Sequence, residues 1–183
     1  PIQILTNNLL YDFSQTGIPA DRVDEELVAR PLHWNIDNIK RFMVFIGPIS
    51  SIFDYATFGL MWFFFRCGAF TGAATGAAER VHLASLFQTG WFVESLLTQT
   101  LIVHIIRTRR IPFVESRASL PMTLTTLAVM GIGAWLPYSP FAAALGLVAL
   151  PSVYWAWVAG FLLTYAALTH VVKTWFMRRF GAE

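Results

Sequence analysis

Residues 118–172 read ASLPMTLTTLAVMGIGAWLPYSPFAAALGLVALPSVYWAWVAGFLLTYAALTHVV and contain no Asp, Glu, Lys or Arg. Two further apolar runs extend from Phe42 to Arg66 and from Val81 to Ile106. Each contains one charged residue in its interior, Asp54 in the first and Glu94 in the second. A helix needs roughly 20 apolar residues to cross the hydrocarbon core of a bilayer, and an open sheet cannot satisfy its backbone groups in lipid. The sequence therefore predicts an all-α protein, a polytopic bundle of transmembrane helices.

The composition of the chain agrees with a membrane protein. Of its 183 residues 56% are hydrophobic and 13% are charged, whereas soluble domains average about 25% charged residues. We predict about five helices, over residues 1–16, 42–65, 81–106, 120–136 and 152–176. We expect residues 1–183 to be one transmembrane domain cut from a longer protein, because the apolar run at Pro1 starts without a signal peptide. The single cysteine, Cys67, excludes an internal disulfide and a zinc or dithiol motif.

The basic residues indicate the orientation of the chain in the membrane. Only Arg66 and Arg80 belong to one set of loops, and the other set is much more basic. By the positive-inside rule we expect loops 20–41 and 107–118 and the carboxyl terminus in the cytoplasm. Short basic clusters beside helices favour contact with lipid head groups rather than nucleic acid. The residues counted as cytoplasmic are Arg22, Arg30, Lys40, Arg41, Arg107, Arg109, Arg110, Arg117, Lys173, Arg178 and Arg179.

The first apolar segment contains an amide and a carboxylate four residues apart, Asn8 and Asp12. This spacing places both side chains on one face of a helix. A carboxylate at the centre of a membrane helix costs on the order of 2.5–3.5 kcal/mol and is a functional residue by default. Oxygen ligands of this kind are what Mg²⁺ and Ca²⁺ bind in proteins. We therefore predict that Asn8 and Asp12 are cation ligands.

Two further acids, Asp54 and Glu94, lie near the middle of their predicted spans. If the first and third segments pack together, Glu94 joins Asn8 and Asp12 as a cation ligand, and few carboxylates with room for water favour Mg²⁺ over Ca²⁺. Asp54 is the weakest candidate ligand, because Ser50 and Ser51 one turn earlier offer it a satisfied polar patch instead. The alternative for each acid is a structural hydrogen bond between helices.

The elements that can be compared with known families are Asn8-x-x-x-Asp12, Gly17-Ile18-Pro19-Ala20, Arg30-Pro31 and the segment from Trp91 to Thr100. They resemble the motifs of P-type cation-transporting ATPases, and within that family those of its bacterial magnesium-importing members. The resemblance covers the whole chain as transmembrane helices six to ten of the family. One departure is Phe13, because calcium pumps have glycine directly after the helix-six aspartate.

The resemblance implies the membrane part of an ATP-driven Mg²⁺ importer of the bacterial inner membrane. It carries cation binding onto Asn8 and Asp12, and less directly onto Glu94. It also implies that the phosphorylated Asp-Lys-Thr-Gly motif and the nucleotide-binding and actuator domains lie outside these residues. The expected partners of this chain are therefore those upstream domains, with their Mg²⁺ and ATP, and membrane lipid. A gradient-driven cation transporter or channel is the main alternative, although it would require inverted repeats and the sequence shows none. A purely structural membrane anchor, the third possibility, would not need Asn8, Asp12 and Glu94 buried in the membrane.

Overall fold

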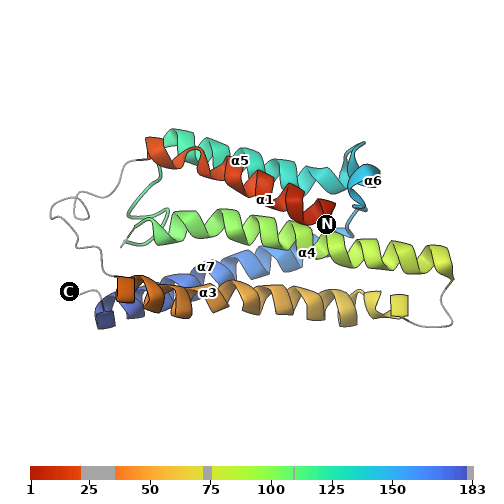
Figure 1. Cartoon of the computed structure of the whole chain (residues 1–183), viewed down its shortest axis with the longest axis horizontal. Helices are drawn as coiled ribbons and strands as arrows, with labels where there is room; N and C mark the ends of the chain where they lie inside the picture. The colour runs from red at the N-terminus through yellow and green to blue at the C-terminus, as the bar shows by residue number, and fades with distance from the viewer. Residues whose placement is uncertain (22–35, 72–75, 109, 181–183) are drawn as a thin grey trace.

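The computed structural model describes residues 1–21, 36–71, 76–108 and 110–180, and these residues form helices and no β-strand. The predicted all-α class is therefore confirmed. The elements, in chain order and with the names of Figure 1, are α1 (Ile2–Gln15), η1 (Ile18–Ala20), α3 (Ile36–Gly59), η2 (Leu60–Phe64), η3 (Cys67–Thr71), α4 (Ala77–Ile106), α5 (Leu120–Trp135), η4 (Leu136–Tyr138), α6 (Ala142–Leu145) and α7 (Ser152–Phe180).

Four segments of the described residues are long and apolar enough to cross a membrane, namely Ile39–Phe64, Ala77–Ile106, Leu120–Tyr138 and Ser152–Phe180. The remaining predicted segment, residues 1–16, corresponds to α1. This helix has 14 residues and is therefore about 21 Å long, shorter than a bilayer core of about 30 Å. Helices α3, α4 and α7 extend beyond the predicted ranges. Charged residues mark the edge of the apolar run, but a helix can continue past that edge into water.

Helix α4 is the centre of the bundle. It packs against α1, α3, α5 and α7, and Figure 1 shows it between an α1–α5 pair and an α3–α7 pair. Two-thirds of its most apolar window is buried, against one-third or less in the other three spans. A helix that is apolar on all sides is expected in a core, and Phe92, Val93 and Leu96 are indeed fully buried.

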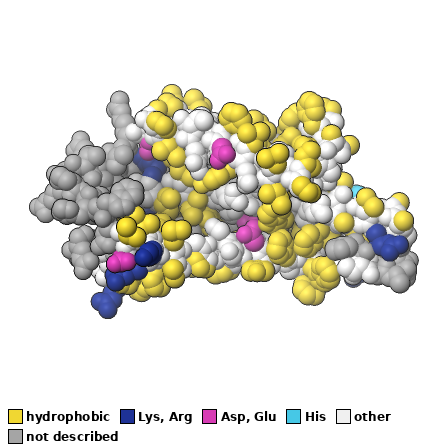
Figure 2. Space-filling view, viewed as in Figure 1, with side chains coloured by type: hydrophobic (Ala, Val, Ile, Leu, Met, Phe, Trp, Pro, Cys, Tyr) yellow, Lys and Arg dark blue, Asp and Glu magenta, His cyan; other side chains and the backbone are white. Residues whose placement is uncertain are grey.

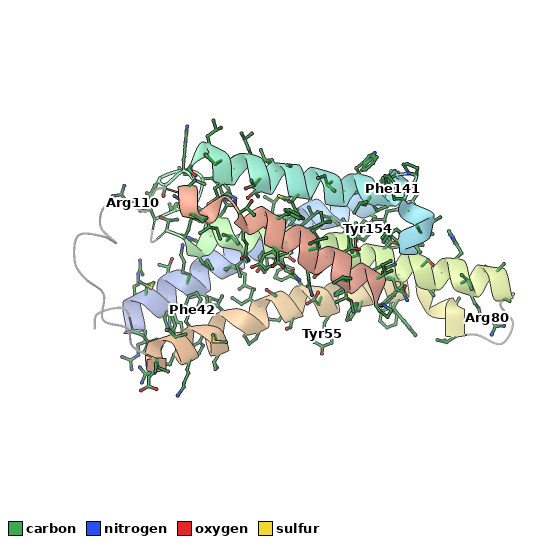
Figure 3. The ribbon with its side chains drawn as sticks, turned by 45° about the horizontal axis from the view of Figure 1, so that its top comes forward. Phe42, Tyr55, Arg80, Arg110, Phe141 and Tyr154 are labelled. Atoms are coloured by element: carbon green, nitrogen blue, oxygen red, sulfur yellow. The ribbon has the colours of Figure 1, made fainter. Side chains whose placement is uncertain are left out.

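The connecting segments alternate between the two ends of the bundle. The last turn of α1, the last turn of α4 and the end of α7 lie at one end in Figure 1. Figure 3 shows Phe42 and Arg110 at that same end and Arg80 at the opposite end. This up-and-down course places the basic loop around Arg107 and the basic end of α7 on one side of the bundle.

A buried lysine attaches α7 to the end of α4. Lys173 is 3% exposed, and its ammonium donates to the backbone carbonyls of Ile105 at 2.8 Å and Thr108 at 2.9 Å. The last carbonyls of a helix have no intrahelical partner, and a cation there is stabilised by the helix dipole. Lys173 therefore acts as a cap for α4 as well as a basic residue of the α7 end.

The loop between α3 and α4 contains the single cysteine. Cys67 is fully buried, and burial raises the pKa of its thiol to about 11. Because the thiolate is the reactive form, we expect iodoacetamide to leave Cys67 unmodified at pH 7 in the folded protein and to modify it after denaturation. Mass spectrometry of the alkylated protein measures this. Fast modification of the native protein at pH 7 would contradict the burial of the thiol.

Candidate functional site

Asn8 and Asp12 lie on one face of α1, as a spacing of four residues requires, and this face is exposed. Their neighbours on this side are apolar and exposed as well: Leu5 is 69% exposed, Leu9 53% and Phe13 56%. Figure 2 shows acidic side chains in the middle of this face of the bundle among hydrophobic and uncharged groups, and others beside basic side chains nearer one end. The amide and the carboxylate are thus brought together, on a face that the other described helices leave uncovered.

The opposite face of α1 is also polar, and this face packs into the bundle. Gln3, Asn7 and Ser14 are its buried residues. The Gln3 amide donates to the backbone carbonyls of Leu145 at 3.1 Å and Gly146 at 3.0 Å. Asn7 is 2% exposed, and its amide has no hydrogen-bond partner among the described residues. Of two adjacent asparagines, the structure turns Asn7 inward and Asn8 outward.

Glu94 is buried at the centre of α4, with 1% of its surface exposed. Neither of its carboxylate oxygens has a hydrogen-bond partner within the described part of the chain. Asp54 and Thr57 of α3 both lie near this carboxyl. The Thr98 hydroxyl, one turn further along α4, donates instead to the backbone carbonyls of Glu94 and Ser95. The carboxyl therefore lies between α3 and α4, on the inner side of the bundle.

Asp54 is half-buried where α3 meets α4. The indole nitrogen of Trp91 donates to its Oδ1 at 2.9 Å. The neighbouring Ser50 pairs with the Tyr165 hydroxyl of α7 at 3.1 Å, and no hydrogen bond from Ser50 or Ser51 to Asp54 is seen within the described residues. This contact of Trp91 with Asp54 was not predicted from the sequence, although a buried indole N–H usually finds an acceptor.

The four predicted ligands differ in their exposure to the surroundings of the bundle. Asn8 and Asp12 are exposed on α1, whereas Glu94 is buried and Asp54 is half-buried. No group of three or more His, Cys, Asp or Glu side chains that could hold a metal ion occurs in residues 1–21, 36–71, 76–108 and 110–180. Any cation site on Asn8 and Asp12 would therefore need ligands or waters from beyond these two side chains.

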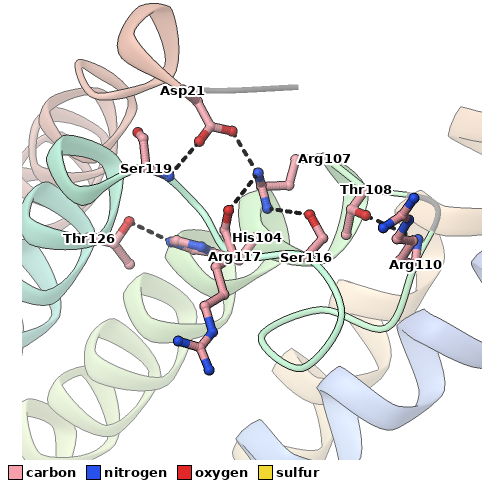
Figure 4. Close-up of polar contacts among 9 residues, drawn as sticks. All are labelled: Asp21, His104, Arg107, Thr108, Arg110, Ser116, Arg117, Ser119 and Thr126. Carbon is pink, nitrogen blue, oxygen red and sulfur yellow. Dashed lines mark hydrogen bonds and ion pairs between the residues drawn. The ribbon is translucent and has the colours of Figure 1, made fainter. Parts of the chain in front are cut away.

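A second polar cluster lies at the end of the bundle, where α1, α4 and α5 meet (Figure 4). The Arg107 guanidinium contacts the Asp21 carboxylate, with Nε and Oδ2 2.7 Å apart and only 10% and 9% of the two side chains exposed. The backbone N–H of Ser119 donates to Asp21 Oδ1 at 2.7 Å. Nearby, a ring nitrogen of His104 shares a hydrogen bond with the Thr126 hydroxyl at 2.8 Å. From the sequence, Arg107 was expected only to add positive charge to a loop, and no role was predicted for Asp21.

Comparison with known proteins assigns the family. The profile of the family described as "Cation transporting ATPase, C-terminus" matches residues 1–175. The chain belongs to this family. It is 50% identical over 99% of its length to a protein of Salmonella typhimurium named "Magnesium-transporting ATPase, P-type 1", and 49% identical over 99% to a protein of that name from Escherichia coli K12.

The chain covers 19% of the length of each of these P-type ATPases. The resemblance found in the sequence motifs is therefore confirmed: the bundle is the C-terminal transmembrane region of a P-type cation-transporting ATPase. Within this family assignment, the residues that bind the cation remain a prediction.

Proposed function

We propose that this chain is the ion-binding and supporting membrane part of an ATP-driven Mg²⁺ importer, with Asn8 and Asp12 as ligands of the transported ion. The observation that carries this proposal is the pair of oxygen-bearing side chains on one exposed face of α1. A polar pair within an apolar helix is retained where it serves a substrate path. The printed names of the relatives, magnesium-transporting ATPases, support Mg²⁺ as the ion.

The chemistry of the pair fits Mg²⁺ as a substrate. Mg²⁺ requires nearly octahedral oxygen coordination and releases its waters reluctantly, so it is commonly held by one or two carboxylates together with water. Asp12 would supply the charged oxygen and Asn8 a neutral carbonyl oxygen. ATP hydrolysis, with its aspartyl-phosphate and Mg²⁺-bound nucleotide, would take place in the remaining length that the relatives have beyond this region.

The two other acids, Glu94 and Asp54, differ in how well their surroundings suit a role as cation ligand. Glu94 is a candidate for an additional ligand, because its oxygens have no hydrogen-bond partner within the described residues. Asp54 is a weaker candidate, because the Trp91 indole already occupies its Oδ1. We propose an order of importance in which Asp12 and Asn8 come first, Glu94 second and Asp54 last.

The same proposal includes the location of the protein. The basic residues near Arg107 and at the end of α7, including Arg178 and Arg179, belong to one end of the bundle. The positive-inside rule favours this end as cytoplasmic, and anionic lipid head groups attract such residues. We therefore propose a multi-pass protein of the bacterial inner membrane with a cytoplasmic carboxyl terminus and lipid as its surroundings.

Mg²⁺ transport by the full-length protein tests the proposed function. In inverted vesicles that contain a luminal Mg²⁺ indicator, ATP added outside should lower luminal Mg²⁺, since the lumen corresponds to the outside of the cell. An ionophore that collapses the gradients of the other ions, but does not itself carry Mg²⁺, should leave this Mg²⁺ flux in place. Mg²⁺ flux that needs no ATP and stops with the ionophore would instead identify a gradient-driven transporter and reject the proposal.

A further inference from the structure

We infer that Asp21 is a positioning residue for the proposed cation site: through Arg107 and the Ser119 amide it fixes the depth and rotation of α1, and hence the direction in which Asn8 and Asp12 face. The inference rests on the proposed function, because it concerns the helix that carries those ligands. It assigns a role in cation binding to a contact at the end of the bundle, away from Asn8 and Asp12.

A single carboxylate connects three elements at this point. Asp21 directly follows η1, the continuation of α1. Arg107 is the C-cap residue of α4 and Ser119 the N-cap residue of α5. Because Oδ2 binds the guanidinium and Oδ1 accepts from the Ser119 N–H, both at 2.7 Å, the end of α1 is tied to two helices at once.

Arg107 is itself held by several further contacts. Its Nη1 donates to the Ser116 hydroxyl at 3.2 Å, and its Nη2 donates to the Arg117 carbonyl at 3.1 Å. The planar guanidinium can make these bonds together in a fixed fork. In addition, a cation at the last turn of α4 is favoured by the helix dipole. Asp21 is therefore bound to a side chain that has little freedom to follow it if α1 moves.

The rest of α1 transmits this attachment to the ligand pair. Near Asp21, the backbone of Gly17 packs so closely against α5 that an added Cβ would lie 2.6 Å from Met122 Cα. At the other end, the Gln3 amide donates to the carbonyls at the end of α6, those of Leu145 and Gly146. Both ends of α1 are thus held by the α5–α6 segment, and Asn8 lies between them.

Small movements of α1 would have large consequences at the ligands. A slip by one residue moves a helix by about 1.5 Å and turns it by about 100°. Metal ligands must lie within about 0.2 Å of their ideal distance. A contact that prevents such slips would therefore contribute to the affinity for Mg²⁺ as well as to the stability of the fold.

Asp21→Asn in the full-length protein tests the inference. The amide keeps the size of the side chain and can still accept from Ser119, but it loses the charge that binds Arg107. We expect the Mg²⁺ concentration for half-maximal ATP hydrolysis to rise about tenfold, in line with coupling energies of residues in contact, and the maximal rate per folded molecule to change less. A purely structural role would lower the amount of folded protein and leave the half-maximal concentration unchanged.

Asp37→Asn is the matched control. It makes the same chemical change in an ion pair of Asp37 with Lys40, which is 3.7 Å long and exposed by 76% and 71%. Exposed pairs contribute little, so the control should keep the wild-type Mg²⁺ dependence. Arg107→Gln should resemble Asp21→Asn, and the double variant should be no worse than the more affected single variant.

A half-maximal Mg²⁺ concentration within twofold of wild type in folded Asp21→Asn protein would overturn the inference. If Asp21→Asn does not fold, Arg107→Lys replaces it, since lysine keeps the charge but cannot form the fork, and a wild-type value there would overturn the inference equally. Failure of the proposed function is distinguishable: in that case Asp12→Asn itself leaves the Mg²⁺ dependence unchanged. If Asp12→Asn abolishes activity and Asp21→Asn is neutral, only the positioning role is rejected.

Discussion

Asp12→Asn should abolish Mg²⁺-dependent ATP hydrolysis by the full-length protein while leaving it folded. The substitution removes one negative charge and keeps the shape of the side chain. Asp12 is exposed on α1, and no hydrogen bond to it is seen within the described residues, so the packing of the bundle should be unaffected. Loss of an outer-shell partner already costs about 10–100-fold in metal affinity or activity, and loss of a direct charged ligand should cost more.

Three comparisons make the Asp12 experiment decisive. Thermal unfolding of the purified variant should match wild type, which separates loss of binding from loss of folding. Asp37→Asn, the same substitution at an exposed residue, should retain activity. Glu94→Gln should weaken the Mg²⁺ dependence less than Asp12→Asn, and an unchanged response would remove Glu94 from the site. Wild-type hydrolysis by Asp12→Asn would reject the proposed site altogether.

The fold was predictable because a membrane helix is specified by a long local pattern. A run such as residues 118–172, without a charged residue, leaves few options for a chain in lipid. Helix ends are specified less well, because the apolar run reports the edge of the hydrocarbon and not the last hydrogen bond. Helix α3 accordingly starts at Ile36 in the structure, before the predicted residue 42.

The inward face of α1 was not predictable from spacing. A four-residue spacing shows that Asn8 and Asp12 share a face, but not whether that face meets a neighbouring helix. Both sides of α1 carry polar residues, and Asn7 differs from Asn8 by one helical step of about 100°. The structure buries Asn7, because α4 and α5 pack against that side of α1.

The polar contacts that connect helices were also beyond sequence analysis. Asp21 and Arg107 are 86 residues apart in the chain, and Asp54 and Trp91 are 37 apart. Such pairs form only when the bundle brings distant segments together, so no local sequence motif predicts them. A general rule, that a buried charge requires a partner, predicts that such contacts exist. It does not identify the partner residue.

Gly17→Ala should lower the stability of the protein by about 1–3 kcal/mol, the usual cost of overpacking. The added Cβ would lie 2.6 Å from Met122 Cα and 2.7 Å from the Thr125 hydroxyl. A backbone atom of α5 cannot rotate away, so α1 and α5 must separate. Gly17 has φ −79° and ψ −14°, a conformation that alanine adopts readily. The expected loss is therefore a consequence of close packing alone, and thermal unfolding measures it.

Gly131→Ala in α5 is the matched control for this loss. Nothing lies within 4 Å of the Cβ that it would add, and alanine is favoured over glycine inside a helix by roughly 0.5–1 kcal/mol. The same substitution should therefore stabilise the protein at residue 131 and destabilise it at residue 17. If Gly17→Ala were as stable as wild type, α1 would not be docked on Met122. In that case the attachment that holds Asn8 and Asp12 in place would also lose one of its supports.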